Sequence, residues 1–315
     1  MKKIIFLTVA AVTLLVANVT KAPAQNSATA ANTAAAPAQN SGGGPKKSLA
    51  ADGLFKRQVI TTRDPMVYPY IREEDIIWSK RIWRTVDLRE KMNFSLYYPT
   101  KEMALRRSLV QTLVDAIRSG EIRAFDPADG DEFTMLLSPE DLSSRFDAVD
   151  KKERRSKMDG SGDTTIIIPG EYNWDEVREL LIKEDWFFDK HYSKMMVRIV
   201  GICPIKVYKK QLNTGNEEDE ADGETQKKQL FWVNYDEVRK VLARMPAYIP
   251  NNDATVVSYD DIFNRRRFTS YITKESNPYN DRPISDYISN GYESLMESER
   301  IKNAIFTFEH DLWEY

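Results

Sequence analysis

The sequence predicts an α+β fold, in which two helix–β-hairpin–helix units form one compact domain with helical segments at its N- and C-terminal ends for packing or partner contact. Three observations predict this class. Some segments repeat apolar residues at helical spacing. Others are short strand-like pairs joined by turn residues or by an acidic loop. Several helix starts carry Asn or Ser followed by acidic residues, as capped helices do.

The N-terminal residues are typical of a secretory signal peptide. Basic residues within 1–3 precede an apolar run at 4–19 and small residues at 22–24, so we expect a cleavable signal peptide over 1–24. A retained membrane anchor is the alternative, but the run is short for a span of about 20 residues. Gln25 stands where a lipoprotein carries its lipidated cysteine, and we therefore expect a mature chain without its own lipid.

Three segments have the composition of linkers or loops. Residues 25–60 are mostly Ala, Asn, Gln, Ser, Thr, Pro and Gly, which bury too little apolar surface to offset the entropy of ordering, so we predict a disordered tether. A flexible loop is predicted at 151–163 and an acidic loop at 211–228. The remaining regions are 61–150, 164–250 and a C-terminal helical segment at 251–315.

Charge and cysteine content limit the possible partners. The formal net charge is −3, and signal cleavage would remove Lys2, Lys3 and Lys21 but no acid. A net acidic chain argues against nucleic acid or anionic lipid as a bulk electrostatic partner. Cys203 is the one cysteine, so no intramolecular disulfide can form and stability must come from a core.

Two helices are predicted before the first hairpin, namely the N-terminal helical segment and the first helix of the first unit. Acids at 73–75 precede basic residues within 80–84, the charge order that the helix macrodipole favours, and this predicts a helix over 73–91. Apolar residues then recur at helical spacing within 103–117, and Gly120 is a natural stop. That pattern predicts an amphipathic helix with one buried face.

A hairpin and a further helix complete the first unit. The segments 121–125 and 133–137 flank Asp-Pro-Ala-Asp-Gly, which is typical of a turn. Ser138 followed by Pro139 then predicts the start of another helix.

The second unit is predicted to repeat this order. A helix over 174–190 leads to strands at 195–208 and 229–234, which flank the acidic loop, and a helix follows from Tyr235.

Two near-identical hexamers lie within this unit. They begin at Asn173 and Asn234 and have the spacing of a capping box, with a looser third case at Ser258. Convergent capping explains the likeness more simply than internal duplication, although both remain open.

The C-terminal segment is interrupted by prolines and ends in a predicted helix. Its apolar stripe consists of Leu295, Ile301, Ile305, Phe308 and Leu312. Because the last ten residues are strongly aromatic, we expect this end to dock on the core or on a partner.

The sequence contains no recognisable catalytic or metal-binding pattern. His191 and His310 do not have zinc-site spacing, and Cys203 is more simply a buried structural residue than a nucleophile. Residues 159–163 begin like an EF-hand loop, but Thr164 stands where glycine is needed. Acidic pairs are too common for the sequence to select a glycosidase pair. We therefore expect no enzyme activity, no metal and no cofactor.

Partner binding explains the large aromatic side chains better than catalysis does. A helix over 73–91 would present Trp78 and Trp83 on different sides, a wider apolar arc than packing on one sheet needs. Trp232, flanked by Phe231 and Val233, is instead predicted to be core. The partner-binding candidates are Tyr68, Tyr70, Trp78, Ile82, Trp83 and Trp313.

The region 60–315 resembles the gliding-motility family GldN, whose counterpart in non-gliding bacteria is PorN. The resemblance rests on the motif WSKRIWR at 78–84 within the longer run from Pro65 to Lys91, and on GICP at 201–204 and FWV at 231–233. It implies a periplasmic component of the type IX secretion system that self-associates in a ring with the lipoprotein GldK (PorK) and contacts the periplasmic region of the motor protein GldM (PorM). Contact with the outer membrane would be indirect, through the lipoprotein.

A periplasmic enzyme or carbohydrate-binding protein that uses exposed carboxylates and aromatics is the alternative. A pocket lined by two carboxylates and aromatic rings would favour it.

Overall fold

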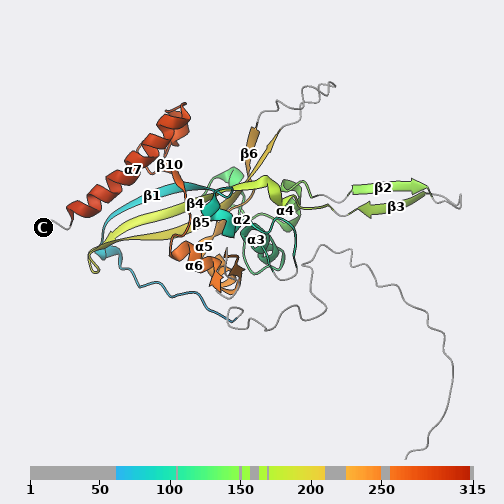
Figure 1. Cartoon of the computed structure of the whole chain (residues 1–315), viewed down its shortest axis with the longest axis horizontal. Helices are drawn as coiled ribbons and strands as arrows, with labels where there is room; N and C mark the ends of the chain where they lie inside the picture. The colour runs from blue at the N-terminus through green and yellow to red at the C-terminus, as the bar shows by residue number, and fades with distance from the viewer. Residues whose placement is uncertain are drawn as a thin grey trace, which may run out of the picture. The chain divides into compact units, whose positions relative to one another are not determined.

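The computed structural model describes residues 62–103, 106–148, 170–209, 225–249 and 256–312, and the backbone alone of 151–156 and 163–168 (Figure 1). The predicted signal peptide, the whole predicted tether, Trp313 and most of the acidic loop lie outside these residues. None of the described helices combines the length and hydropathy that crossing a membrane requires.

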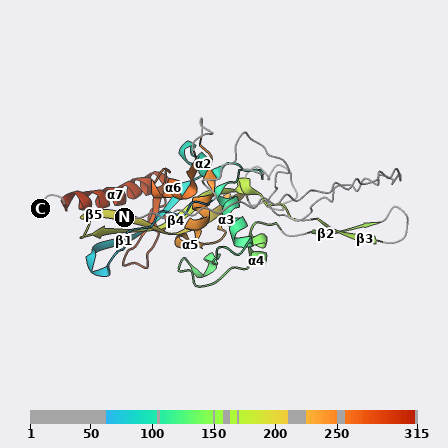
Figure 2. The ribbon, with the colours of Figure 1, turned by 90° about the horizontal axis from the view of Figure 1, so that it is seen from below.

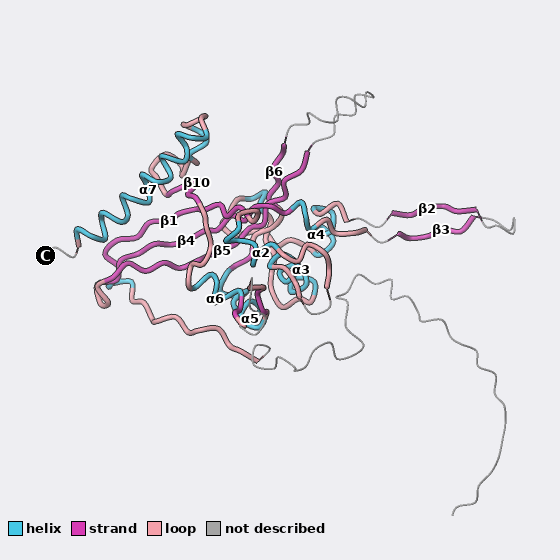
Figure 3. The backbone as a smooth tube through the Cα atoms, viewed as in Figure 1, coloured by secondary structure: helices cyan, strands magenta, loops and turns pink. Residues whose placement is uncertain are grey.

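An antiparallel sheet organises the fold and, with the helices, confirms the α+β class. Neighbouring strands β1, β4 and β5 are the longest and run side by side (Figures 1 and 3). The strands in spatial order are β10 (Tyr271–Glu275), β1 (Ile76–Asp87), β4 (Val177–Asp189), β5 (Lys194–Lys209) and β6 (Thr225–Gln229), and β7 (Val233–Asn234) also pairs with β5.

The helix predicted over 73–91 is wrong, because most of this segment is strand β1. The acids at 73–75 form one short 3₁₀ turn, and the strand begins at Ile76. β-branched and aromatic residues dominate the strand, and they favour extended backbone. The residues from Ile82 to Val86 are all buried, because both faces of β1 are covered there. The apolar residues that suggested a wide apolar arc on a helix therefore belong to a strand that is buried on both faces.

The helix predicted over 174–190 is wrong for the same reason. Asn173 makes no side-chain cap, Trp174–Glu176 is a 3₁₀ turn, and β4 follows at once. β4 and β5 form a long hairpin, so the second unit lacks its first helix. The hexamer that begins at Asn234 does start a helix, in which the Asn234 side chain accepts a hydrogen bond from Asp236 N at 2.9 Å.

Most of the other predicted helices are present, though some are shorter. The helices are α2 (Phe94–Tyr97), α3 (Leu109–Arg118), α4 (Pro139–Arg145), α5 (Tyr235–Arg244), α6 (Tyr259–Asn264) and α7 (Gly291–Asp311). A capping box at Ser108 starts α3, so the helix begins at Leu109, six residues later than the start predicted at 103. Gly120, at φ 74°, follows its end as expected. Ser138 caps α4 and Ser258 caps α6.

Two predicted loop regions differ from the structure. The arms predicted at 121–125 and 133–137 meet only through an isolated antiparallel bridge, Phe125 with Leu136. In the predicted flexible loop, β2 (Lys151–Ser156) pairs with β3 (Asp163–Ile168), whose Thr and Ile residues favour extended backbone.

The C-terminal segment is not only helical. It contains β9 (Val257–Ser258), which pairs with β8 (Pro246–Ala247), and it supplies β10 to the main sheet. The predicted stripe lies on α7, with Leu312 as its C-cap, and α7 packs beside β10 (Figure 1). Seen from below, α7 runs along one side of the long strands (Figure 2). Ile272 N in β10 donates to Ser298 Oγ in α7 at 2.7 Å, so the helix satisfies an outward-facing N–H of this edge strand.

The two faces of the sheet pack against different elements. Side chains alternate along a strand, so Leu180 and Ile182 face one side and Leu181 the other. Leu180 and Ile182 belong to the largest core, with residues of α3, α5 and α6. On the same face, Ile82 packs against Ile301 of α7 in a second cluster. The opposite face has a third, smaller cluster and leaves room for a pocket.

Candidate functional site

Tyr68 connects the segment before β1 to helices α5 and α6. Its ring lies 3.8 Å from the Arg239 guanidinium carbon and 4.6 Å from that of Arg198. Its hydroxyl donates to Asn264 Oδ1 at 3.0 Å. Tyr70, two residues later, is 83% exposed. Of these two candidates, therefore, Tyr68 is held within the chain and Tyr70 is available to a partner.

Trp78 packs against the C-terminal end of α7. Its ring stacks on Phe308 with centroids 4.9 Å apart and an interplanar angle of 29°. Because Ile301 and Ile305 also pack on Ile82, α7 docks on its own chain through one face. The structure thus brings Trp78 and Ile82 into one cluster, whereas Trp313 lies outside the described residues.

Trp83 lies on the opposite face of β1 from Ile82. It is 4% exposed and packs in a cluster with Phe125, Cys203 and Trp232. Its indole Nε1 donates to Asp131 Oδ2. Trp83 and Ile82 are therefore core residues on different faces.

The structure exposes apolar side chains that the sequence reasoning missed. Ile77 is 62% exposed, and Phe306 is 66% exposed. They adjoin in sequence the stacked pair Trp78 and Phe308. The sequence signal was present for Phe306, which stands on the helix outside the stripe of Ile301 and Ile305, but exposure of Ile77 required the strand register.

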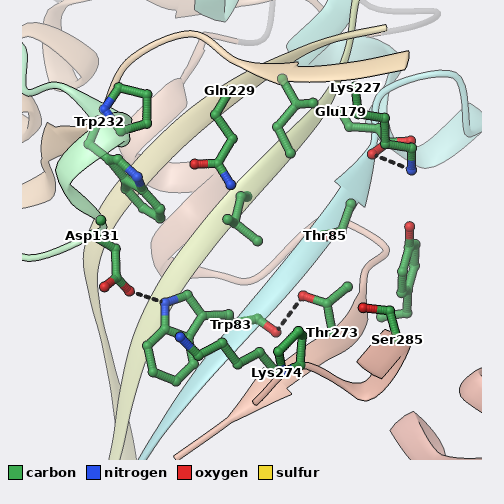
Figure 4. Close-up of a pocket in the computed structure, with 16 residues that line it drawn as sticks. Trp83, Thr85, Asp131, Glu179, Lys227, Gln229, Trp232, Thr273, Lys274 and Ser285 are labelled. Atoms are coloured by element: carbon green, nitrogen blue, oxygen red, sulfur yellow. Dashed lines mark hydrogen bonds and ion pairs between the residues drawn. The ribbon is translucent and has the colours of Figure 1, made fainter. Parts of the chain in front are cut away.

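A pocket of about 580 Å³ lies on the sheet face opposite the main core (Figure 4). Its floor comes from alternate residues of the strands, including Trp83, Leu181 and Ile205. Its walls come from β6, from the segment 127–131 and from residues near Ser285.

The wall segment 127–131 is held in place by contacts that the residues on either side of it make. Phe125 and Trp232 exchange two backbone hydrogen bonds of 2.8 and 2.9 Å. A Cβ added at Gly201 in β5 would lie 2.6 Å from the Phe133 ring, so the glycine makes room for that ring on the sheet.

The pocket contains two carboxylates, and both are already engaged. Glu179 lies 2.8 Å from Lys227 Nζ, and Asp131 lies 3.4 Å from Lys183 Nζ in addition to its bond from Trp83. Partial burial by itself would raise the pKa of Asp131, but Lys183 and the Trp83 N–H more than offset this, so the pKa lies below its ordinary value. A general acid needs the opposite shift.

The sequence model described as Gliding motility associated protein GldN matches residues 71–314. The chain belongs to the GldN family. The match runs from just before the first 3₁₀ turn through α7, so the sheet, the pocket and the Trp78 stack all lie within the GldN region. GldN membership makes the chain a component of the gliding-motility and type IX secretion machinery. No curated protein sequence matches the chain significantly.

The geometry of this GldN chain gives the enzyme alternative no support. The pocket has the aromatic rings and two carboxylates that would favour it, but both carboxylates are paired with lysines, and the pKa of Asp131 is shifted away from that of a general acid. Cys203 is fully buried, and burial raises the pKa of its thiol. His191 is exposed in the turn between β4 and β5. Within the described residues, no three His, Cys, Asp or Glu side chains gather as a metal site.

The lowered pKa of Asp131 predicts a pH-dependent contribution to stability. A depressed pKa stabilises the fold above the unfolded value of 3.8, and this contribution is lost as the pH falls through the folded pKa. Asp131→Asn should therefore lower the free energy of unfolding by about 1 kcal/mol at pH 7, and the deficit should shrink below about pH 5. Urea unfolding at stepped pH measures it. Glu132→Gln, at an exposed neighbour, is the control, and a deficit of equal size at pH 7 and pH 3 would contradict the assignment.

Proposed function

We propose that this chain is a non-enzymatic structural component of the type IX secretion and gliding machinery that assembles into a periplasmic ring. In this proposal it associates with further copies of itself and with the outer-membrane lipoprotein GldK (PorK), and it contacts the periplasmic region of the motor protein GldM (PorM). GldN family membership supports a place in the machinery. The predicted signal peptide without a lipidated cysteine supports a periplasmic chain whose membrane attachment comes from the lipoprotein.

The observation that carries the proposal is the exposure of three large apolar side chains, Tyr70 before β1, Ile77 at its start and Phe306 on α7, which we call together the β1-start surface. These side chains are 83, 62 and 66% exposed. Large apolar side chains of this kind are typical of interfaces.

The backbone of β1 adds to this surface. β10 pairs only with Ile82–Thr85, and Ser276 extends the contact as far as Arg81. The earlier residues of β1 pair with β4 on one side, and no described strand pairs with them on the other. An unpaired edge of this kind accepts a strand from another chain.

Charge substitutions at this surface test the proposal. Ile77→Lys with Phe306→Glu should leave folding intact, because both side chains are exposed. Recovery of the lipoprotein with the chain from detergent-solubilised envelopes should fall about tenfold, and secretion should fall with it, because interface centres tolerate charge poorly. Tyr279→Lys is the matched control, since Tyr279 is 67% exposed at a turn after β10.

Two results would contradict the proposal at different levels. Wild-type lipoprotein recovery and secretion in the double variant would show that the β1-start surface is not the contact. A wild-type chain that purifies from envelopes as a monomer without lipoprotein would contradict the ring itself.

A further inference from the structure

Two lysines and two carboxylates line the sheet pocket, and a third lysine, Lys183, lies against it and pairs with one of the carboxylates. Lys183 and Lys227 pair with the acids Asp131 and Glu179. Lys274 also lines the pocket, and its Nζ lies 4.1 Å from the centre of the Trp83 ring. Among the described residues no carboxylate lies within ion-pair distance of Lys274, although its charge is one cause of the lowered pKa of Asp131. Its ammonium therefore has a ring on one side and can donate to an anion on the other.

The same pocket has an unsatisfied donor in its wall. Trp232 is 1% exposed, and its indole Nε1 has no hydrogen-bond partner. Of the described side-chain atoms in that condition, the other two are the Oε2 atoms of Glu176 and Glu275, which lie 2.7 Å from Lys206 and Lys80 and are therefore ion-paired. A buried N–H without an acceptor is costly, so an acceptor from a ligand would lower the free energy of this wall.

An acceptor can reach the buried Trp232 Nε1 only if a neighbouring side chain moves, and we infer that this side chain is Gln229. Gln229 and Trp232 both line the pocket, and Figure 4 shows the Gln229 amide at the same end as the indole. Gln229 is exposed on the short strand β6, so turning its side chain aside costs little.

These features select a ligand class. The two carboxylates that would accept hydrogen bonds from sugar hydroxyls are engaged by Lys227, Lys183 and Trp83. A single excess cation is too little charge for a nucleic acid backbone. A peptide supplies both missing groups: a carboxylate for the cation and carbonyl oxygens for the indole.

We propose that this pocket binds an acidic segment of another polypeptide in extended conformation, in which a carboxylate accepts from Lys274 Nζ and a main-chain carbonyl accepts from Trp232 Nε1. Apolar side chains of that segment pack on Trp83, Leu181 and Ile205 of the floor. The site is separate from the β1-start surface, and it does not depend on the ring.

Two blocked peptides of the same shape test the proposal with the purified full chain. The acidic probe is acetyl-Gly-Asp-Leu-Asp-Gly-amide, and the neutral probe is acetyl-Gly-Asn-Leu-Asn-Gly-amide. The titration is followed by ¹⁹F NMR of the chain, in which the 6 tryptophans are replaced by 5-fluorotryptophan. The signals of Trp83 and Trp232, assigned with the Phe variants, should shift saturably, and the acidic probe should bind about tenfold more tightly.

Variants separate the two contacts. Lys274→Gln should reduce the affinity for the acidic probe to that for the neutral probe and leave the neutral probe unchanged. Trp232→Phe should weaken both probes about equally, roughly fivefold, because both offer the same carbonyl. Lys228→Gln, at an exposed neighbour on β6, is the charge-matched control and should change nothing.

The proposal is overturned if the two probes bind equally, if neither shifts Trp83 or Trp232 at millimolar concentration, or if chitohexaose shifts them and the peptides do not. Should Trp232→Phe fail to fold, Lys274→Gln still decides the outcome, since Lys274 lies in an edge strand and is only half-buried.

Discussion

Replacing Trp83 with alanine is expected to lower the free energy of unfolding of the purified chain by about 3–5 kcal/mol. The side chain is 4% exposed, packs with Phe125, Cys203 and Trp232, and donates to Asp131. Its removal leaves a cavity on the sheet and deprives the Asp131 carboxylate of a donor. Urea unfolding followed by circular dichroism measures the loss.

This expectation changes the meaning of a secretion defect in the variant. From the sequence, Trp83 is a candidate partner contact, and its loss would then reduce ring assembly or secretion without reducing the amount of protein. From the structure, we expect a lower amount of protein in the cell. Tyr70→Ala is the control, because Tyr70 is 83% exposed and should change stability by less than about 0.5 kcal/mol. Normal accumulation and stability of Trp83→Ala, with secretion lost, would restore the contact role.

Replacing Glu184 with glutamine should cost about 3–5 kcal/mol of unfolding free energy. Glu184 is fully buried in β4, where it accepts from Arg84 at 3.1 Å and from Arg266 at 2.9 and 3.1 Å. Trp186 Nε1 also donates to it at 3.0 Å. Burial lowers the pKa of Arg84, and Glu184 opposes this shift. Without the carboxylate, two guanidinium groups face each other with no counter-charge.

The neighbouring residue supplies the control for Glu184. Asp185→Asn removes a carboxylate that pairs with Arg81 at 2.6 Å, but this pair is partly exposed. Exposed pairs are worth about 0–1 kcal/mol, so the control should lose little. Equal losses for the two variants in the same urea titration would show that burial of the Glu184 network does not matter. Adding Arg84→Met to Glu184→Gln should recover part of the stability, because it removes the stranded charge.

The helices with local caps and the long strand β5, predicted at 195–208, were predictable from sequence, but the long strands β1 and β4 were not. Ser138, Asn234 and Ser258 each accept a hydrogen bond from the first turn of the helix that follows, a signal contained within four residues. The near-identical hexamer at Asn173 shows the limit of such signals. There the chain makes one 3₁₀ turn and continues as β4, because the following residues are held between β1 and β5. Pairing with distant strands overrides the local preference.

The partner-binding candidates were identified from the sequence as one group, but the face of the sheet on which each side chain lies depends on the strand register. Ile82 and Trp83 are adjacent, and only a strand sends them to opposite faces. The pocket could not have been found from sequence, because its floor and walls come from segments as far apart as Trp83, Asp131 and Ser285. Trp232 was correctly predicted to be core, but the missing partner of its indole appears only once its neighbours are placed.

The pairing of β1 with β10 has a consequence for how the chain matures. The contact between Thr273 and Trp83 joins residues 190 positions apart. During synthesis, which proceeds from the N-terminus, β1 therefore emerges long before the strand that covers its edge. Contacts of such long range slow folding, and the apolar strand stays exposed to other chains in the meantime. Because β10 begins at Tyr271, the sheet can close only after all but the last 45 of the 315 residues have been made.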